Sequence, residues 1–147
     1  MDAVTLAMHL VGGCFVPQPR WDATEALRLI ETERVTSLYL APTLFHDLVH
    51  NPDLSSRDVS SVRALGYAGA AMTSTLVRRC IDVFAPDVFV NHYGSTEIYT
   101  FTIGRNQAGK PGCAGRPAVN TRLRVLEGDE ICVDLASDEA FAGYWNR

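Results

Sequence analysis

Residues 62–90 read VRALGYAGAAMTSTLVRRCIDVFAPDVFV, two short apolar runs separated by a segment with helical spacing. Residues 62–67 and 88–90 have the composition and length of buried strands. Between them, Thr73 opens a segment whose apolar side chains recur at the spacing of one helix face. A strand, a helix and a strand in this order predict two parallel strands joined by a crossover helix.

Further strands and helices are predicted on the N-terminal side. Residues 37–41 have the pattern of a buried strand, and Pro42 stands where a first helical residue belongs. Asp22 and Glu25 form an acidic version of the capping box, which opens an amphipathic helix. This alternation predicts an α/β fold with a parallel sheet and crossover helices. Ligands of such sheets bind beyond the carboxyl ends of the strands.

The two ends of the chain depart from this alternation. Residues 3–11 are almost wholly apolar and predict a buried helix stopped by glycine, and residues 14–16 predict a short buried strand. Residues 104–117 are rich in glycine and proline, which predicts a flexible surface connection. Residues 121–126 and 130–135 flank Glu-Gly-Asp and predict an antiparallel hairpin.

These patterns predict two parts of unequal size. Residues 1–100 are expected to form an α/β subdomain that carries half of a ligand site. Residues 101–147 are expected to begin a small antiparallel, barrel-like β unit.

Composition and charge narrow the class of protein. With 147 residues, of which 47% are hydrophobic, the chain can bury the core of one domain. Its formal net charge of -4 and the lack of a basic stripe argue against nucleic acid as a partner. No stretch reaches the roughly 18–20 apolar residues that cross a bilayer, and the first residues lack a basic signal region. We therefore expect a cytoplasmic protein without a transmembrane segment.

The spacing of the histidines and cysteines leaves a zinc site, and with it a zinc hydrolase, as a minor alternative. His46 and His50 are separated by one helical turn, as in zinc helices, but no third ligand is near in sequence. No Cys-x-x-Cys pair occurs, so we expect the cysteines to be small core residues. The four cysteines are Cys14, Cys80, Cys113 and Cys132.

Two turns that follow neighbouring predicted strands carry the strongest indication of a ligand site. Residues 69–71, Gly-Ala-Ala, offer backbone that a flat ligand or an anion can approach. Residues 91–97 read Asn-His-Tyr-Gly-Ser-Thr-Glu, and Glu97 is the only charged side chain in residues 88–104 when histidine is neutral. Either turn alone also fits close packing or a tight strand exit. Gly94-Ser95-Thr96 lacks the second glycine of a hydrolase nucleophile elbow.

Residues 93–97, Tyr-Gly-Ser-Thr-Glu, match the Tyr-Gly-x-Thr-Glu motif of the adenylate-forming enzymes. This family includes acyl-CoA and aryl-CoA ligases, luciferases and the adenylation domains of peptide synthetases. The chain resembles the family along its whole length, and most closely the benzoate and 4-chlorobenzoate CoA ligases, as an internal fragment of the N-terminal domain. Five further matches lie at residues 41–43, 67–72, 110–117, 128–131 and 141–145.

The resemblance implies roles for residues of both turns. Tyr93 would pack on the adenine ring, Thr96 would contact the α-phosphate, and Glu97 would help to bind Mg²⁺, which makes Thr96 and Glu97 the implied catalytic residues. His92 would lie beside the carboxylate substrate. The other residues implied to line the adenine and acyl pocket are Gly69, Ala70, Ala71 and Gly94.

The resemblance also implies the reaction and its substrates. A carboxylic acid attacks the α-phosphate of ATP to give an acyl-adenylate and pyrophosphate, and coenzyme A then takes the acyl group as a thioester. Mg²⁺ fits this role because it is held by one or two carboxylates together with substrate phosphates.

Several parts of the family's catalytic apparatus have no match in these residues. The phosphate-gripping loop would precede them, and the ribose-binding aspartate and the catalytic lysine would follow. Lys110, the single lysine, matches a surface-loop position. The isolated chain is therefore expected to be inactive, and a noncatalytic binding or assembly domain is the alternative. Exposed core surface also predicts self-association, which a monomer in sedimentation at high concentration would contradict.

Overall fold

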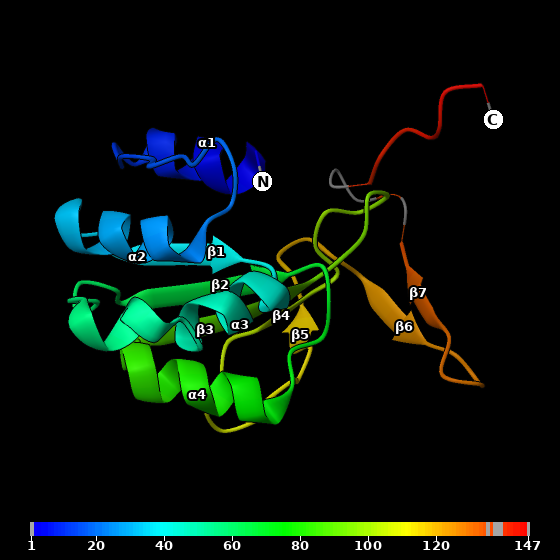
Figure 1. The fold of residues 1–147 in the computed structure, drawn as a ribbon. Coiled ribbons are helices and arrows are strands. Elements are labelled where there is room, and N and C mark those ends of the chain that lie inside the picture. The colour runs from blue at the N-terminus through cyan, green and yellow to red at the C-terminus, as the bar shows by residue number, and fades with distance from the viewer. Residues whose placement is uncertain (1, 135, 137–139, 147) are drawn as a thin grey trace.

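The computed structural model describes residues 2–134, 136 and 140–146. A five-stranded sheet with the order β1-β2-β3-β4-β5 forms its centre (Figure 1). β1, β2 and β3 run parallel, whereas β4 pairs antiparallel with both β3 and β5, so the predicted α/β fold is confirmed. The strands are β1 (Ser37–Leu40), β2 (Ala64–Ala68), β3 (Val88–Tyr93), β4 (Thr102–Gly104) and β5 (Arg116–Pro117).

Helices connect the parallel strands and cover the sheet. α2 packs against α3, and α3 packs against α4, while Figure 1 shows α1 beyond α2 at the N-terminal end. None of the described helices is long and apolar enough to span a membrane. The helices are α1 (Asp2–Leu10), α2 (Ala23–Thr32), α3 (Pro42–Val49) and α4 (Ser74–Phe84), with a short 3₁₀ helix η1 (Pro52–Ser56).

The core lies where α2, α3 and α4 meet the sheet. The Phe89 ring of β3 packs against Phe45 of α3 and edge-on against Tyr67 of β2, with ring centroids 6.2 and 5.8 Å away. Leu27 of α2 and Val77 of α4 are fully buried beside them. This core holds the three parallel strands in fixed positions and thereby fixes the edge at which they end.

Local signals set the helix starts as predicted. The Asp22 carboxylate accepts a hydrogen bond from the Glu25 amide at 2.9 Å, and Pro42 occupies the first turn of α3. Thr73 caps α4 through its hydroxyl oxygen. The capping box at α2 is half formed, because the Glu25 carboxylate pairs with Arg28 of its own helix instead of reaching back.

The predicted burial near the N-terminus is wrong. α1 forms at the expected place, but Leu10 is 88% exposed and Leu6 is also exposed. Residues 14–16 form no strand, and the Phe15 side chain is exposed. Apolar composition predicted a buried layer here, but in the described part of the chain no second layer covers these side chains.

The cysteine prediction holds at one position. Cys80 on α4 is fully buried and packs as a core residue. Cys14 and Cys113 are exposed and Cys132 is half-buried. Cys14 and Cys113 lie in connections, and Cys132 lies in the short strand β7.

The C-terminal hairpin is confirmed but shorter than expected. β6 (Leu123–Val125) pairs antiparallel with β7 (Ile131–Val133), and residue 135 of the predicted strand lies outside the described residues. The linking turn uses positive φ angles at Gly128 (84°) and Asp129 (61°). β4 and β5 belong to the sheet of β3, so strand pairing continues past residue 100. The division into residues 1–100 and 101–147 stays a prediction.

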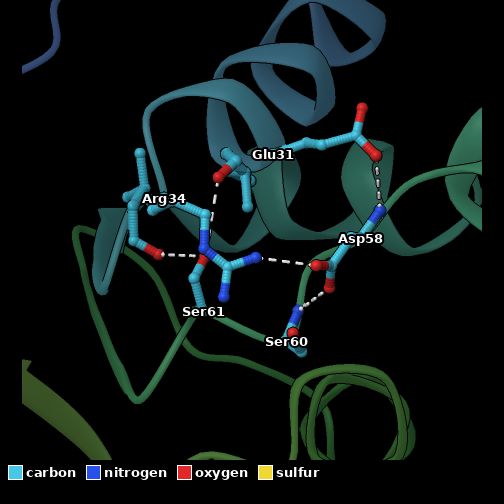
Figure 2. A network of polar contacts seen from close by, with 7 residues as sticks. Glu31, Arg34, Asp58, Ser60 and Ser61 are labelled. Atoms are coloured by element: carbon cyan, nitrogen blue, oxygen red, sulfur yellow. Dashed lines mark hydrogen bonds and ion pairs between the residues drawn. The ribbon is translucent and has the colours of Figure 1, made fainter.

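A polar network braces the end of α2 against the connection that leads into β2 (Figure 2). Asp58 accepts a hydrogen bond from Arg34 at 2.7 Å, and its amide donates to Glu31 at 2.9 Å. The Ser61 hydroxyl donates to the Val35 carbonyl at 2.9 Å. Hydrogen bonds from Ser60 and then from Arg34 lower the pKa of Asp58 to about 2.

The lowered pKa of Asp58 predicts a loss of stability in acid. A carboxyl whose pKa is lower in the folded state stabilises the fold above its unfolded pKa and stops doing so as pH falls through the folded pKa. We expect Asp58→Asn to lower the melting temperature at pH 7, and the difference from wild type to shrink between about pH 4 and pH 2. Asp82→Asn, at an exposed position on α4, is the matched control. A difference that stays constant from pH 7 to pH 2 would contradict this role of Asp58.

Candidate functional site

The two predicted turns leave the sheet side by side. In the parallel ladder, Ala68 of β2 lies opposite His92 of β3, and Leu40 of β1 lies opposite Tyr67. The strands therefore end at one edge, where the turn after Ala68 and the segment after His92 begin. This edge is where ligands of parallel α/β sheets bind.

The turn at residues 69–71 is open to solvent. Gly69 has a φ of +88°, which a residue with a side chain adopts only with strain. A Cβ placed there would meet no described atom within 4 Å, so the conformation, and not tight packing, calls for glycine. Ala70 and Ala71 are also exposed, whereas Met72 is buried and anchors the turn before α4. The result is an accessible stretch of backbone.

The neighbouring turn is tight. The Phe101 amide donates to the Tyr93 carbonyl at 2.7 Å, and the Ser95 amide donates to the Ile98 carbonyl at 3.0 Å. A Cβ on Gly94 would overlap the carbonyl oxygen of Tyr99. Here close approach of two backbone segments requires glycine, and the turn is held in one conformation.

Glu97 lies within this turn as an ionised acceptor. Hydrogen bonds from the Ser95 side chain and then from Tyr144 lower the pKa of Glu97 to about 2. The Tyr144 hydroxyl donates to Oε1 of the carboxylate. Thr96 beside it is exposed. At neutral pH the site therefore holds a full negative charge with an exposed hydroxyl next to it.

Aromatic residues flank the two turns. The Tyr93 ring is partly exposed and packs edge-on against Phe101, with centroids 5.4 Å apart. His92 is half-buried, and a 2.9 Å hydrogen bond joins its Nδ1 to the Tyr39 hydroxyl. Burial lowers the pKa of His92 and raises the pKa of Tyr39 to about 12. Both side chains are therefore uncharged at neutral pH.

The side chains at the strand edge suit a divalent cation that is also coordinated by a bound phosphate ligand. Within the described residues, no group of three or more histidine, cysteine, aspartate or glutamate side chains could hold a metal by itself. His46 and His50 lie on the exposed flank of α3, with ring centroids 4.2 Å apart. Glu97 supplies an ionised carboxylate at the strand edge. One such carboxylate is sufficient for Mg²⁺ when phosphates and water complete its coordination.

Sequence reasoning missed a buried amide beneath the site. Gln107 is 1% exposed, and its Oε1 accepts hydrogen bonds from the Tyr67 hydroxyl and the Gly112 amide, both at 3.0 Å. Its Nε2 donates to the carbonyls of Gly104 at 3.1 Å and Cys113 at 2.9 Å. All four hydrogen bonds of the amide are thus made.

These contacts correct the expectation of a flexible connection at residues 104–117. Gln107 ties the segment to β2, and the Asn91 side chain donates to the Cys113 carbonyl at 3.3 Å. The Gly112 position faces the Met72 carbonyl, next to the turn at residues 69–71. A single glutamine in a glycine-rich segment has no periodicity that could reveal its burial.

An apolar cavity adjoins the N-terminal side of the sheet and reaches β1. Its volume is about 500 Å³, and α1, residues 14–18, α2 and β1 contribute to its lining. It includes Tyr39 but neither turn of the candidate site. The ionised carboxylate, the open backbone and the exposed aromatic ring all lie at the strand edge, so the chemistry favours that edge over the apolar cavity.

Comparison with known proteins places the whole arrangement in one family. The pattern of the family described as AMP-binding enzyme matches residues 1–145. The chain is 30% identical over 149 residues to the medium/long-chain-fatty-acid CoA ligase FadD8 of Mycobacterium tuberculosis, covering 92% of this chain and 26% of the relative. It is 35% identical over 124 residues to a 4-chlorobenzoate CoA ligase of a Pseudomonas species. That match covers 84% of this chain and 23% of the relative.

A solved structure has the same fold. The N-terminal domain of FACL13 from Mycobacterium tuberculosis superposes with a TM-score of 0.82 at 24% identity, covering 99% of this chain and 39% of that one. The chain spans about a quarter of the length of the two curated relatives named above, 26% and 23%. The expected resemblance to adenylate-forming enzymes is confirmed, and the chain belongs to the AMP-binding enzyme family.

Proposed function

We propose that this chain forms one wall of the ATP site of an acyl-CoA or aryl-CoA ligase. The reaction would join a carboxylic acid to AMP as an acyl-adenylate and transfer the acyl group to coenzyme A. The observation that carries the proposal is the register of Ala68 opposite His92, so that the open turn at residues 69–71 and the segment that carries the ionised Glu97 leave neighbouring strands at the same end of the sheet. Membership of the AMP-binding family, with relatives named fatty-acid and 4-chlorobenzoate CoA ligases, supports this class.

Each residue of the edge has a proposed task. The exposed face of Tyr93 would receive the adenine ring, and the open backbone at residues 69–71 would line its other side. Gly94 keeps the turn tight, so that Thr96 presents its hydroxyl to the α-phosphate. The uncharged His92 would lie beside the carboxylate substrate, where an imidazole can hydrogen-bond without a fixed charge.

Glu97 is the proposed protein ligand of Mg²⁺. When bound with ATP, Mg²⁺ neutralises phosphate charge and so favours attack of a carboxylate on the α-phosphate. The low pKa of Glu97 keeps its carboxylate ionised at neutral pH. Residues 88–104 contain no other charged side chain, so no cationic side chain of that segment neutralises the carboxylate. Glu97 would orient the cation, and Thr96 would orient the phosphate.

The remaining apparatus is proposed to come from outside residues 1–147. A loop for the outer phosphates, an aspartate for the ribose and a catalytic lysine complete this site in the proposed enzyme. Lys110 is exposed on the connection at residues 104–117 and is not assigned to catalysis. We further propose that the full-length enzyme is cytoplasmic, and that residues 1–100 and 101–147 belong to different subdomains of it.

The reaction class is tested by pyrophosphate exchange in the full-length protein. With ATP and Mg²⁺, we expect incorporation of labelled pyrophosphate into ATP only when a carboxylic acid is added, because exchange requires a reversible acyl-adenylate step. A panel of fatty and aromatic acids supplies the substrate, and the corresponding alcohols serve as controls. Exchange that is absent with every acid in the panel would favour a noncatalytic domain.

A further inference from the structure

The C-terminal segment, residues 140–146, lies against the turn that carries Glu97. The Phe141 amide donates to the Glu97 carbonyl at 2.9 Å, and Ile98 and Ala140 form an antiparallel bridge. These two backbone contacts hold the segment next to residues 97 and 98. The Tyr144 hydroxyl then reaches the side chain of Glu97 and donates to Oε1.

The Tyr144 ring has its own support. It packs edge to face against Phe141, with ring centroids 4.9 Å apart. The Phe141 amide is hydrogen-bonded to the Glu97 carbonyl, so the Tyr144 ring packs on a residue that is fixed to the backbone of Glu97 itself. Such a closed arrangement restricts the torsions of a glutamate side chain that would otherwise have several rotamers.

The hydrogen bond leaves the carboxylate able to bind a cation. An ionised carboxylate has about four lone-pair sites. The Ser95 and Tyr144 side chains and the Glu97 amide donate to the Glu97 carboxylate, which leaves at least one lone-pair site for a cation. A neutral hydroxyl also leaves the negative charge in place, unlike a lysine or arginine partner. Groups that hydrogen-bond a metal-binding carboxylate usually fix its orientation and strengthen metal binding.

We propose that Tyr144 is a positioning residue, which holds the Glu97 carboxylate in the orientation that binds a divalent cation together with the phosphates of ATP. This inference rests on the proposed function, because it takes Glu97 as the cation ligand. It gives residues 140–146 a task at Glu97, which precedes Tyr144 by 47 positions in the sequence.

The test measures cation binding directly in the full-length protein. Mn²⁺ is titrated into ATP in the presence of excess protein, so that little unbound ATP remains to chelate the cation, and its free concentration is followed by electron paramagnetic resonance. We expect Tyr144→Phe to raise the Kd for Mn²⁺ about tenfold, the lower range for loss of such a partner. Trp145→Phe is the matched control and should leave the Kd unchanged, since Trp145 is 92% exposed in the same segment. Tyr144 is half exposed, so Tyr144→Phe is expected to fold, which thermal melting verifies.

A parallel titration of Glu97→Ala separates the two proposals. If Glu97→Ala weakens Mn²⁺ binding and Tyr144→Phe does not, the positioning role of Tyr144 is wrong and the proposed role of Glu97 stands. If neither variant changes the Kd, the proposed role of Glu97 fails. Tighter Mn²⁺ binding by Tyr144→Phe would mean that the hydroxyl competes with the cation, which also overturns the inference.

Discussion

Glu97→Ala in the full-length enzyme is expected to slow acyl-adenylate formation about a hundredfold, the usual effect of removing one strong electrostatic contact from a transition state. Glu97 is the only charged side chain in residues 88–104, so no charged neighbour in that segment can replace it. The rate is measured as pyrophosphate release at saturating ATP and carboxylic acid. Glu97→Gln should cause a similar loss, because the amide keeps the shape of the side chain but not its charge.

Glu130→Ala provides the control for this experiment. Glu130 is exposed next to the hairpin turn between β6 and β7, and its removal changes the net charge of the protein by the same amount. We expect pyrophosphate release to be unchanged in that variant. Unchanged release in Glu97→Ala, with the protein folded, would remove Glu97 from the proposed site.

Gln107→Leu is expected to cause the largest loss of stability. The substitution leaves the Tyr67 hydroxyl, the Gly112 amide and two carbonyls without their partner. Of these groups, the Tyr67 hydroxyl and the Gly104 carbonyl belong to buried residues, whereas Gly112 and Cys113 are exposed. Each buried polar group left unpaired costs about 1–3 kcal/mol, so we expect the free energy of unfolding to fall by at least about 2 kcal/mol. Urea denaturation of the chain gives this quantity, with the slope of the transition checked for constancy.

Gln18→Leu is the matched control for Gln107→Leu. Gln18 is half-buried, and its amide makes an exposed hydrogen bond to the Asp22 carbonyl at 3.3 Å. Changes at such positions usually stay within about 0.5 kcal/mol. A similarly small change for Gln107→Leu would mean that water replaces the lost partners and that residues 104–117 are not held by this amide.

The parts of the fold that sequence predicted are those with local causes. Asp22, Pro42 and Thr73 mark helix starts because a cap or a first-turn proline acts within one helical turn. The apolar runs of the three parallel strands predict strands because a strand in a parallel sheet carries few polar residues. These same strands bring the two turns to one edge, so their proximity was foreseeable.

Features that depend on distant contacts were missed or misjudged. The apolar residues of α1 suggested burial, but burial depends on what packs against the helix, and Leu10 is exposed. Gln107 and Tyr67 are 40 positions apart, and no local pattern relates them. Tyr144 and Glu97 are 47 positions apart, and no local pattern relates them either. The roles implied for residues 69–71 and 92–97 stay predictions that the geometry supports.

The most direct test is a crystal structure of the full-length enzyme with a nonhydrolysable ATP analogue and Mg²⁺. We predict the adenine ring against Tyr93 and the backbone of residues 69–71, with the Glu97 carboxylate coordinating the cation. Nucleotide bound in the apolar cavity between α1, α2 and β1, or a cation without contact to Glu97, would contradict the proposed site.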